Sequence, residues 1–126
     1  MDNLADHGVR FGRIAAVLPV IDMQRAERFY SRVLGFRKTY QAGDPVRFII
    51  MERDRGELHL SFQPNMTIAS GFPVAHLMVD DPDRFFNACK ARGVRLLQQV
   101  KDEDGRLEAF VIEDSEGNRI DIGRSA

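Results

Sequence analysis

The sequence predicts an α+β fold built from two tandem βαβββ modules. Three observations predict it: one amphipathic helical pattern in each half, three strand patterns after each helix, and a nearly constant offset between equivalent positions. At 126 residues the chain is long enough for one hydrophobic core. We expect a flexible N-terminal arm over residues 1–10 and a single domain over 11–126, with module one at about 13–64 and module two at about 72–124.

Each half contains one helix with its own start and stop signals. Apolar residues recur at helical spacing over 23–34 and, as a shorter stripe, over 82–92. An aspartate that can act as N-cap precedes each pattern, and a glycine that can adopt a left-handed conformation follows it. These capping and terminating residues are Asp22 and Gly35 in the first half, and Asp81 and Gly93 in the second.

One strand precedes each helix and three follow it, separated by turns rich in Gly, Asp and Asn. In the first half the strands are predicted at Ile14 to Val20, Phe36 to Gln41, Val46 to Glu52 and Leu58 to Gln63. In the second half they are predicted at Pro73 to Val79, Arg95 to Val100, Leu107 to Glu113 and Arg119 to Gly123. A module of this size leaves one sheet face uncovered, so each module requires the other or a second chain.

The two halves are in register with each other. The capping residues Asp22 and Asp81 are 59 positions apart (81 − 22 = 59), and Gly35 and Gly93 are 58 apart (93 − 35 = 58). The segment Asn65 to Gly71 then acts as the linker between the copies. An unrepeated ferredoxin-like α+β sandwich remains the alternative.

Charge and composition exclude several classes of function. The net charge of −1 gives no general attraction to nucleic acid or to anionic membranes, and no apolar run approaches the roughly 18 residues of a membrane span. Cys89 is the only cysteine, so no internal disulfide can form, which favours the cytoplasm. Its place on the apolar side of a helix indicates packing and not nucleophilic chemistry.

Two motifs carry a resemblance to a known superfamily. They are Val-Ile-Asp-Met-x-x-Ala-x-x-Phe-Tyr-x-x-x-Leu-Gly-Phe, from Val20 to Phe36, and Asp-Ser-Glu-Gly-Asn-Arg-Ile, from Asp114 to Ile120. Together they resemble the vicinal-oxygen-chelate superfamily of glyoxalase I, extradiol dioxygenases, fosfomycin-resistance enzymes and bleomycin-resistance proteins, over about residues 13–124. The resemblance implies curved sheets that form a cleft, and a homodimer that completes the ligand site.

Within this superfamily the chain looks nearest to the bleomycin-resistance-like branch. The similar features are Leu18-Pro19-Val20 before the first helix, Gly56-Glu57-Leu58-His59-Leu60-Ser61 in the fourth strand, and the short tail after Ile122-Gly123. This branch implies a protein that sequesters a small molecule, and it does not require the named drug to be the ligand.

The metal positions that the resemblance implies are only partly filled. Ala15 and Val74 stand at the two first-strand positions, and neither side chain can coordinate a metal. His59 and Asp121 stand at the two last-strand positions, and two protein ligands make a poor catalytic site. His76 lies on the same strand face as Val74, so a shifted site of His59, His76 and Asp121 for Zn²⁺, Ni²⁺, Mn²⁺ or Fe²⁺ is conceivable.

Three functions therefore remain open. The preferred hypothesis is a dimeric protein without catalytic residues or cofactor that binds a small, partly aromatic or cationic ligand. The alternatives are a metal-dependent lyase or dioxygenase, and a domain that serves mainly in dimerisation or interaction. The candidate ligand-binding residues, taken from strand faces expected to point inward, are Phe48, His59, Ser61, His76, Glu108, Phe110 and Asp121. Each also has a purely structural interpretation, such as the polar face of a half-buried strand.

Overall fold

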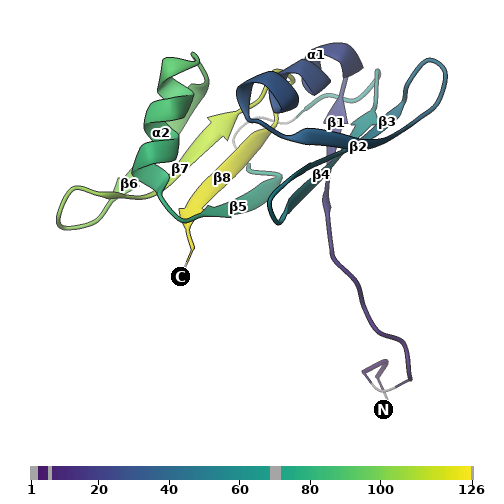
Figure 1. The fold of residues 1–126 in the computed structure, drawn as a ribbon, viewed down its shortest axis with the longest axis horizontal. Coiled ribbons are helices and arrows are strands. Elements are labelled where there is room, and N and C mark those ends of the chain that lie inside the picture. Colours follow the sequence, from purple (N-terminus) through teal and green to yellow (C-terminus); the bar gives the residue numbers. More distant parts are fainter. Residues whose placement is uncertain (1–2, 6, 69–71, 126) are drawn as a thin grey trace.

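The chain forms two βαβββ modules, as predicted (Figure 1). The computed structural model describes residues 3–5, 7–68 and 72–125. The first module contains β1 (Ala16–Val20), α1 (Met23–Arg28), η1 (Phe29–Val33), β2 (Arg37–Ala42), β3 (Phe48–Arg53) and β4 (Gly56–Phe62). The second contains β5 (Ala75–Val79), α2 (Pro82–Ala91), β6 (Arg95–Lys101), β7 (Leu107–Glu113) and β8 (Arg119–Arg124).

Each module has one mixed four-stranded sheet, and the two sheets share the same topology. The strand orders are β1-β4-β3-β2 and β5-β8-β7-β6. In both sheets the first strand pairs in parallel with the last, and the remaining neighbours are antiparallel. The helices α1 and α2 lie on the same side of the molecule in Figure 1, each against its own sheet. The internal repeat inferred from residue spacing is therefore a repeat of topology.

The residues predicted to cap and to end the two helices do so in the structure. The Asp22 and Asp81 carboxylates each accept a hydrogen bond from the main-chain N–H three residues later, at 3.0 Å. This bond satisfies one of the N–H groups that the first helical turn leaves free. Gly35 and Gly93 both have φ = +74°, a conformation in which other residues are strained, and there the chain leaves the helix for the next strand.

The first helix departs from the regular α-helix expected over 23–34. It is α-helical only to Arg28 and continues as a π-helix, η1, through Val33. The buried residues Ala26, Tyr30 and Leu34 recur every four positions. In a regular α-helix such residues drift around the axis by about 40° per step, because a turn contains 3.6 residues. The wider π turn reduces this drift and keeps Tyr30 and Leu34 facing the core.

The core draws on both modules. One cluster of buried apolar side chains joins residues of β1, β3 and β4 with residues of β7 and β8. Leu18, Met51 and Leu60 in the first sheet, and Phe110 and Ile122 in the second, are fully buried. The helix-facing sides of both sheets therefore contribute to one core, whereas their opposite faces are left open.

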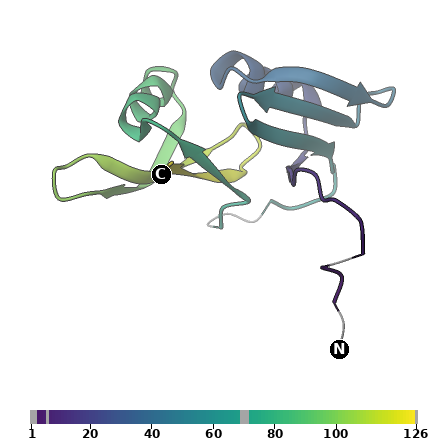
Figure 2. The same ribbon diagram turned by 60° about the horizontal axis from the view of Figure 1, so that its bottom comes forward.

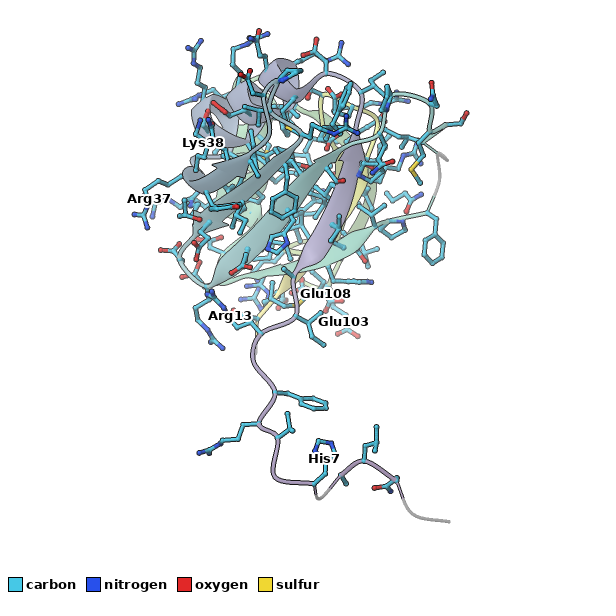
Figure 3. All side chains as sticks on the ribbon, turned by 90° about the vertical axis from the view of Figure 1, so that its right-hand side faces the viewer. His7, Arg13, Arg37, Lys38, Glu103 and Glu108 are labelled. Carbon is cyan, nitrogen blue, oxygen red and sulfur yellow. The ribbon has the colours of Figure 1, made fainter. Side chains whose placement is uncertain are left out.

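The N-terminal segment stands away from this core (Figures 2 and 3). The described residues before Ala16 form neither helix nor strand, so the first strand begins two residues later than the expected Ile14. Of the expected linker, residues 65–68 are described and 69–71 lie outside the described residues. Among the described helices, none combines the length and apolar character that crossing a bilayer demands.

Candidate functional site

Strand alternation gives each sheet one core face and one open face. In β4, Leu58 and Leu60 are buried against the helix, and the intervening His59 and Ser61 point to the opposite, open face. In β8, Ile120 and Ile122 are buried and Asp121 points to the open face. The polar strand residues His59, Ser61 and Asp121 therefore lie on the two open faces.

An aromatic row crosses the open face of the first sheet. The Tyr40 ring lies 6.2 Å from the Phe48 ring, and the Phe48 ring lies 5.3 Å from the His59 imidazole, both edge to face. Register places Phe48 opposite Ser61 across the β3–β4 ladder, so the hydroxyl of Ser61 adjoins the same row. This face offers aromatic edges and faces together with hydrogen-bonding groups.

A charged cluster lies at one end of this row. His59 Nε2 is 2.7 Å from Glu57 Oε2, and Arg13 Nη2 is 2.8 Å from Glu57 Oε1. Arg13 also reaches Glu52 at 3.6 Å, so one guanidinium faces two carboxylates. The contact of Arg13 with Glu57 Oε1 is an ion pair without hydrogen-bond geometry, and this buried oxygen has no hydrogen-bond partner among the described residues. The Glu57 carboxylate is therefore held by charge more than by hydrogen bonds at this end of the row.

The open face of the second sheet carries a simpler pair. His76 and Asp121 are register partners across the parallel β5–β8 ladder, and His76 Nδ1 lies 3.3 Å from Asp121 Oδ2. The His76 side chain is 67% exposed, so its ring is accessible from solvent. On the same face the Met78 side chain packs over Gly123, where a Cβ atom would lie 3.1 Å from the Met78 methyl group.

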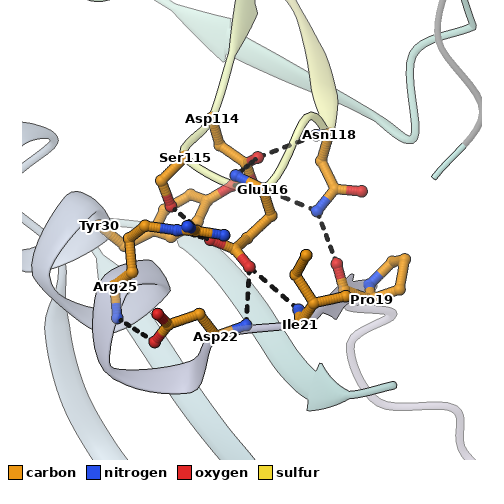
Figure 4. A network of polar contacts seen from close by, with 9 residues as sticks. All are labelled: Pro19, Ile21, Asp22, Arg25, Tyr30, Asp114, Ser115, Glu116 and Asn118. Carbon is orange, nitrogen blue, oxygen red and sulfur yellow. Dashed lines mark hydrogen bonds and ion pairs between the residues drawn. The ribbon is translucent and has the colours of Figure 1, made fainter. Parts of the chain in front are cut away.

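A buried polar network joins the two modules at the β7–β8 turn (Figure 4). Tyr30 donates its hydroxyl hydrogen to Asp114 Oδ2 at 2.7 Å, and the main-chain N–H groups of Glu116 and Asn118 donate to Asp114 Oδ1 at 2.8 and 2.9 Å. The Asn118 amide then donates to the main-chain oxygen of Pro19 at 2.9 Å. These bonds run from the second module to α1, η1 and β1 of the first.

Glu116 extends this network through further hydrogen bonds to the first module. Its Oε1 accepts from the main-chain N–H groups of Ile21 and Asp22 at 3.0 and 2.9 Å. Its Oε2 accepts from Arg25 Nε at 2.7 Å and from the Ser115 hydroxyl at 3.0 Å. The Glu116 side chain is fully buried, and both of its oxygens are satisfied. The network holds the modules together, and among its described, buried side-chain nitrogen and oxygen atoms only Asn118 Oδ1 has no hydrogen-bond partner.

Burial and hydrogen bonding shift the pKa values of this network in different directions. Burial raises the pKa of Asp114, and the hydrogen bond from Tyr30 only partly offsets it. Burial, and then the charge of Asp114, raise the pKa of Tyr30 well above its ordinary value. Burial also opposes ionisation of Glu116, but the hydrogen bonds from Arg25 and from main-chain N–H groups outweigh it and lower the Glu116 pKa.

The comparison with protein families agrees with this architecture. The model of the Glyoxalase/Bleomycin resistance protein/Dioxygenase superfamily matches residues 10–122, almost the whole chain. The chain belongs to this superfamily. The motif residues that sequence analysis used for the resemblance, including Tyr30, Asp114 and Asn118, form the buried network between the modules. These residues therefore join the two modules of the fold.

Solved structures of the glyoxalase/bleomycin resistance fold are similar over most of the chain. The bleomycin-binding protein of bleomycin-producing Streptomyces verticillus, solved with copper(II)-bleomycin, is 23% identical, with a TM-score of 0.73 and 94% of this chain and 99% of that chain covered. A bleomycin resistance determinant encoded on transposon Tn5 is 22% identical, with a TM-score of 0.74 and 91% and 98% covered. Lactoylglutathione lyase from Agrobacterium tumefaciens is 18% identical, with a TM-score of 0.69 and 90% and 93% covered. None of the curated proteins compared with the chain matches it.

The metal positions of the superfamily do not assemble a metal site within one chain. His59 lies on β4 of the first sheet, whereas His76 and Asp121 lie on the second sheet. Val17, and not a metal-binding residue, is the register partner of His59 on β1. Across residues 3–5, 7–68 and 72–125, no three His, Cys, Asp or Glu side chains are grouped closely enough to hold a metal ion. The residues present in a single chain therefore do not fit the superfamily metal.

Two of the predicted ligand-binding residues, Phe110 and Glu108, do not lie on the open faces. Phe110 is fully buried below α2, with its ring 5.3 Å from the Phe86 ring and 6.1 Å from the Phe85 ring. Register places Val111 opposite Asp121, so Val111 and not Phe110 shares the open face with Asp121. Glu108 is exposed, but alternation along β7 places it on the same side as Phe110. The sequence signal failed here because β7 is apolar on both faces.

The other candidates lie on the open faces. Phe48, His59 and Ser61 occupy the first face, and His76 and Asp121 occupy the second. The aromatic row and the charged cluster also contain Tyr40, Glu52, Glu57 and Arg13, which were not among the predicted site residues. Arg13 could not be found from periodicity, because it precedes the first strand and reaches β3 and β4 only through the tertiary fold.

Proposed function

We propose that the chain is a small-molecule-binding protein that sequesters a partly aromatic, cationic ligand against its open sheet faces. The observation that carries this proposal is the aromatic row of Tyr40, Phe48 and His59 ending in the acidic cluster around Glu57. A flat, unsaturated group can pack against the rings, and a positively charged group can pair with the carboxylates.

The electrostatics of the first open face favour a cation. Glu52 and Glu57 share a single guanidinium, that of Arg13, so the cluster retains an excess negative charge when His59 is neutral. Glu57 is largely buried, with 15% of its side chain exposed, and charge pairs in such positions are screened less than pairs on the open surface. Asp121 adds a second carboxylate on the other open face.

A homodimer would enclose the ligand. Val17, Tyr40, Val74 and Met78 are apolar or aromatic side chains that are 42–59% exposed. Apolar exposure of this kind, rimmed by polar residues, is typical of surfaces that another molecule covers. A second chain that placed its second sheet over the first sheet would cover both faces and complete a cleft between them.

Some of the relatives support a binding role. Two similar structures are a bleomycin-binding protein and a bleomycin resistance determinant, so antibiotic sequestration is the working hypothesis for this chain. The single buried Cys89, whose pKa burial raises to about 11, suits a cytoplasmic protein, because such a thiol stays largely protonated at neutral pH and reacts slowly.

Isothermal titration calorimetry against bleomycin, with and without bound copper, tests the proposal. We expect the Phe48→Ala and His59→Ala variants to bind about 3- to 10-fold more weakly, since an aromatic contact contributes about 0.5–1.5 kcal/mol beyond its buried area. The matched control is His7→Ala, which removes an imidazole from the N-terminal segment far from the sheets (Figure 3). Absence of heat with bleomycin and with a panel of planar aromatic cations would contradict the proposal.

The alternative function is a metal-dependent lyase or dioxygenase. It requires His59 of one chain to meet His76 and Asp121 of another, because a single chain keeps them on separate sheets. Elemental analysis of protein purified without chelators separates the two functions. About one metal ion per chain, lost in His59→Ala, would favour the enzyme over the binding protein.

A further inference from the structure

A groove separate from the aromatic row runs between the two modules along β5. Its volume is about 1810 Å³, larger than the roughly 300–1,000 Å³ typical of small-molecule pockets. One wall is α2, and the other is formed by the end of η1 and the β3–β4 turn. Tyr40, Phe48 and His59 do not line it.

The interior of this groove is apolar. Leu34 and Phe36 from the first module, and Leu77 and Phe85 from the second, line it with buried or half-buried side chains. The modules approach each other closely here, because a Cβ atom on Gly56 would lie 3.7 Å from Leu77 Cδ1. An apolar body in the groove would therefore touch both modules at once.

Cationic side chains dominate the rim of the groove. Six arginines and four acidic residues line it, an excess of two positive charges (6 − 4 = 2) on a chain whose net charge is −1. Three of the four acids already have roles: Asp54 lies 3.9 Å from Arg53, Glu57 holds His59, and Asp81 caps α2. The positive excess of the rim is therefore available to a ligand.

Three of the arginines have no side-chain partner in the part of the chain that the structure describes. They are Arg32, Arg55 and Arg84. The guanidinium of Arg53, by contrast, donates to the Leu34 main-chain oxygen at 2.7 Å. A guanidinium without a partner beside apolar side chains is suited to a carboxylate, phosphate or sulfonate.

We propose that this groove binds an amphipathic anion with an extended apolar body, whose anionic group pairs with an arginine of the rim, among Arg32, Arg55 and Arg84. The size and open shape of the groove favour a chain-like body over a compact ring system. Glu57, His76 and Met78 line this groove as well as the open faces, but Tyr40, Phe48 and His59 do not line it, so the arginine variants and His59→Ala test the two sites separately.

Cys89 supplies a readout specific to this groove. It is the only cysteine of the chain and it lines the groove with 3% of its surface exposed. Alkylation with iodoacetamide at mildly alkaline pH is followed by mass spectrometry, with sodium decanoate as the probe and decanol as its uncharged counterpart. Decanoate at ten times its dissociation constant should slow alkylation by about tenfold, because only the free fraction remains open to the reagent.

Matched variants test the role of charge. Combined Arg32→Gln, Arg55→Gln and Arg84→Gln substitutions should weaken decanoate binding about tenfold, since each exposed charge pair contributes a few-fold. The control combines Arg10→Gln, Arg37→Gln and Arg106→Gln, which remove the same charge outside the groove. This control and His59→Ala should leave protection of Cys89 unchanged.

Several results would overturn the proposal. The first is decanoate binding that does not protect Cys89 from alkylation. The second is equal protection of Cys89 by decanol, and the third is unchanged decanoate binding in the variant that combines Arg32→Gln, Arg55→Gln and Arg84→Gln. Protection that increases with protein concentration in the absence of decanoate would show that a second copy of the chain covers the groove, which also overturns it.

Discussion

The buried network and the open-face cluster both contain a glutamate–arginine pair, but the two pairs differ in burial and in hydrogen bonding. Each contains a glutamate paired with an arginine: Glu116 with Arg25 at 2.7 Å, and Glu57 with Arg13 at 2.8 Å. Glu116 is fully buried and both of its oxygens accept hydrogen bonds, whereas one oxygen of Glu57 has no hydrogen-bond partner among the described residues. The fully satisfied Glu116 therefore stabilises the fold, whereas Glu57 lies on the open face where we propose that a ligand binds.

Of the substitutions in these two regions, Asp114→Ala should reduce the stability of the protein most. It removes the acceptor of the Tyr30 hydroxyl and of two main-chain N–H groups, all buried. We expect the free energy of unfolding to fall by about 3 kcal/mol, because buried donors without partners keep their full desolvation cost. Urea denaturation measures this, with Asp104→Ala at an exposed turn as the control; an equal loss in both variants would contradict the assignment.

The Glu116→Gln substitution should have an intermediate effect and a distinct pH dependence. Because the Glu116 pKa is lowered by folding, its charge stabilises the protein above the ordinary value of 4.5, and this contribution is lost as pH falls through the lowered pKa. Asp114 acts in the opposite sense: its pKa is raised, so its contribution is present at acid pH and lost as pH rises.

We expect Glu116→Gln to lower the free energy of unfolding near neutral pH by about 1–2 kcal/mol, the usual contribution of charged hydrogen bonds. Its stability should then fall less steeply than that of the wild type as the pH decreases below about 4.5. Urea denaturation across this pH range checks both effects, and a variant with unchanged acid sensitivity would show that Glu116 is not the group responsible.

The His59→Ala substitution should have the smallest effect on stability. The His59 side chain is 22% exposed and loses its contact with Phe48, but its partner Glu57 keeps the ion pair with Arg13, so we expect a loss of about 0.5–1 kcal/mol. Ligand affinity should fall in the same variant. A large loss of stability would place His59 with the structural network and weaken its assignment to the binding face.

The sequence by itself determined the elements and their repetition. Asp22 and Asp81 as caps, Gly35 and Gly93 as helix ends, and alternation in β4 are local signals, because the physics that makes them acts within a few residues. The absence of metal-binding side chains at Ala15 and Val74 was likewise readable from the chain alone.

Only the tertiary structure decided which residues meet. Arg13 joins Glu52 and Glu57, and Asp114 meets Tyr30 across 84 positions, through contacts that no local pattern encodes. Phe110 was misplaced because β7 is apolar on both faces, and only its pairing with β8 and its cover by α2 fix which face is buried. Strand pairing and module packing therefore set the candidate binding face, since long-range contacts and not sequence neighbours determine its shape and charge.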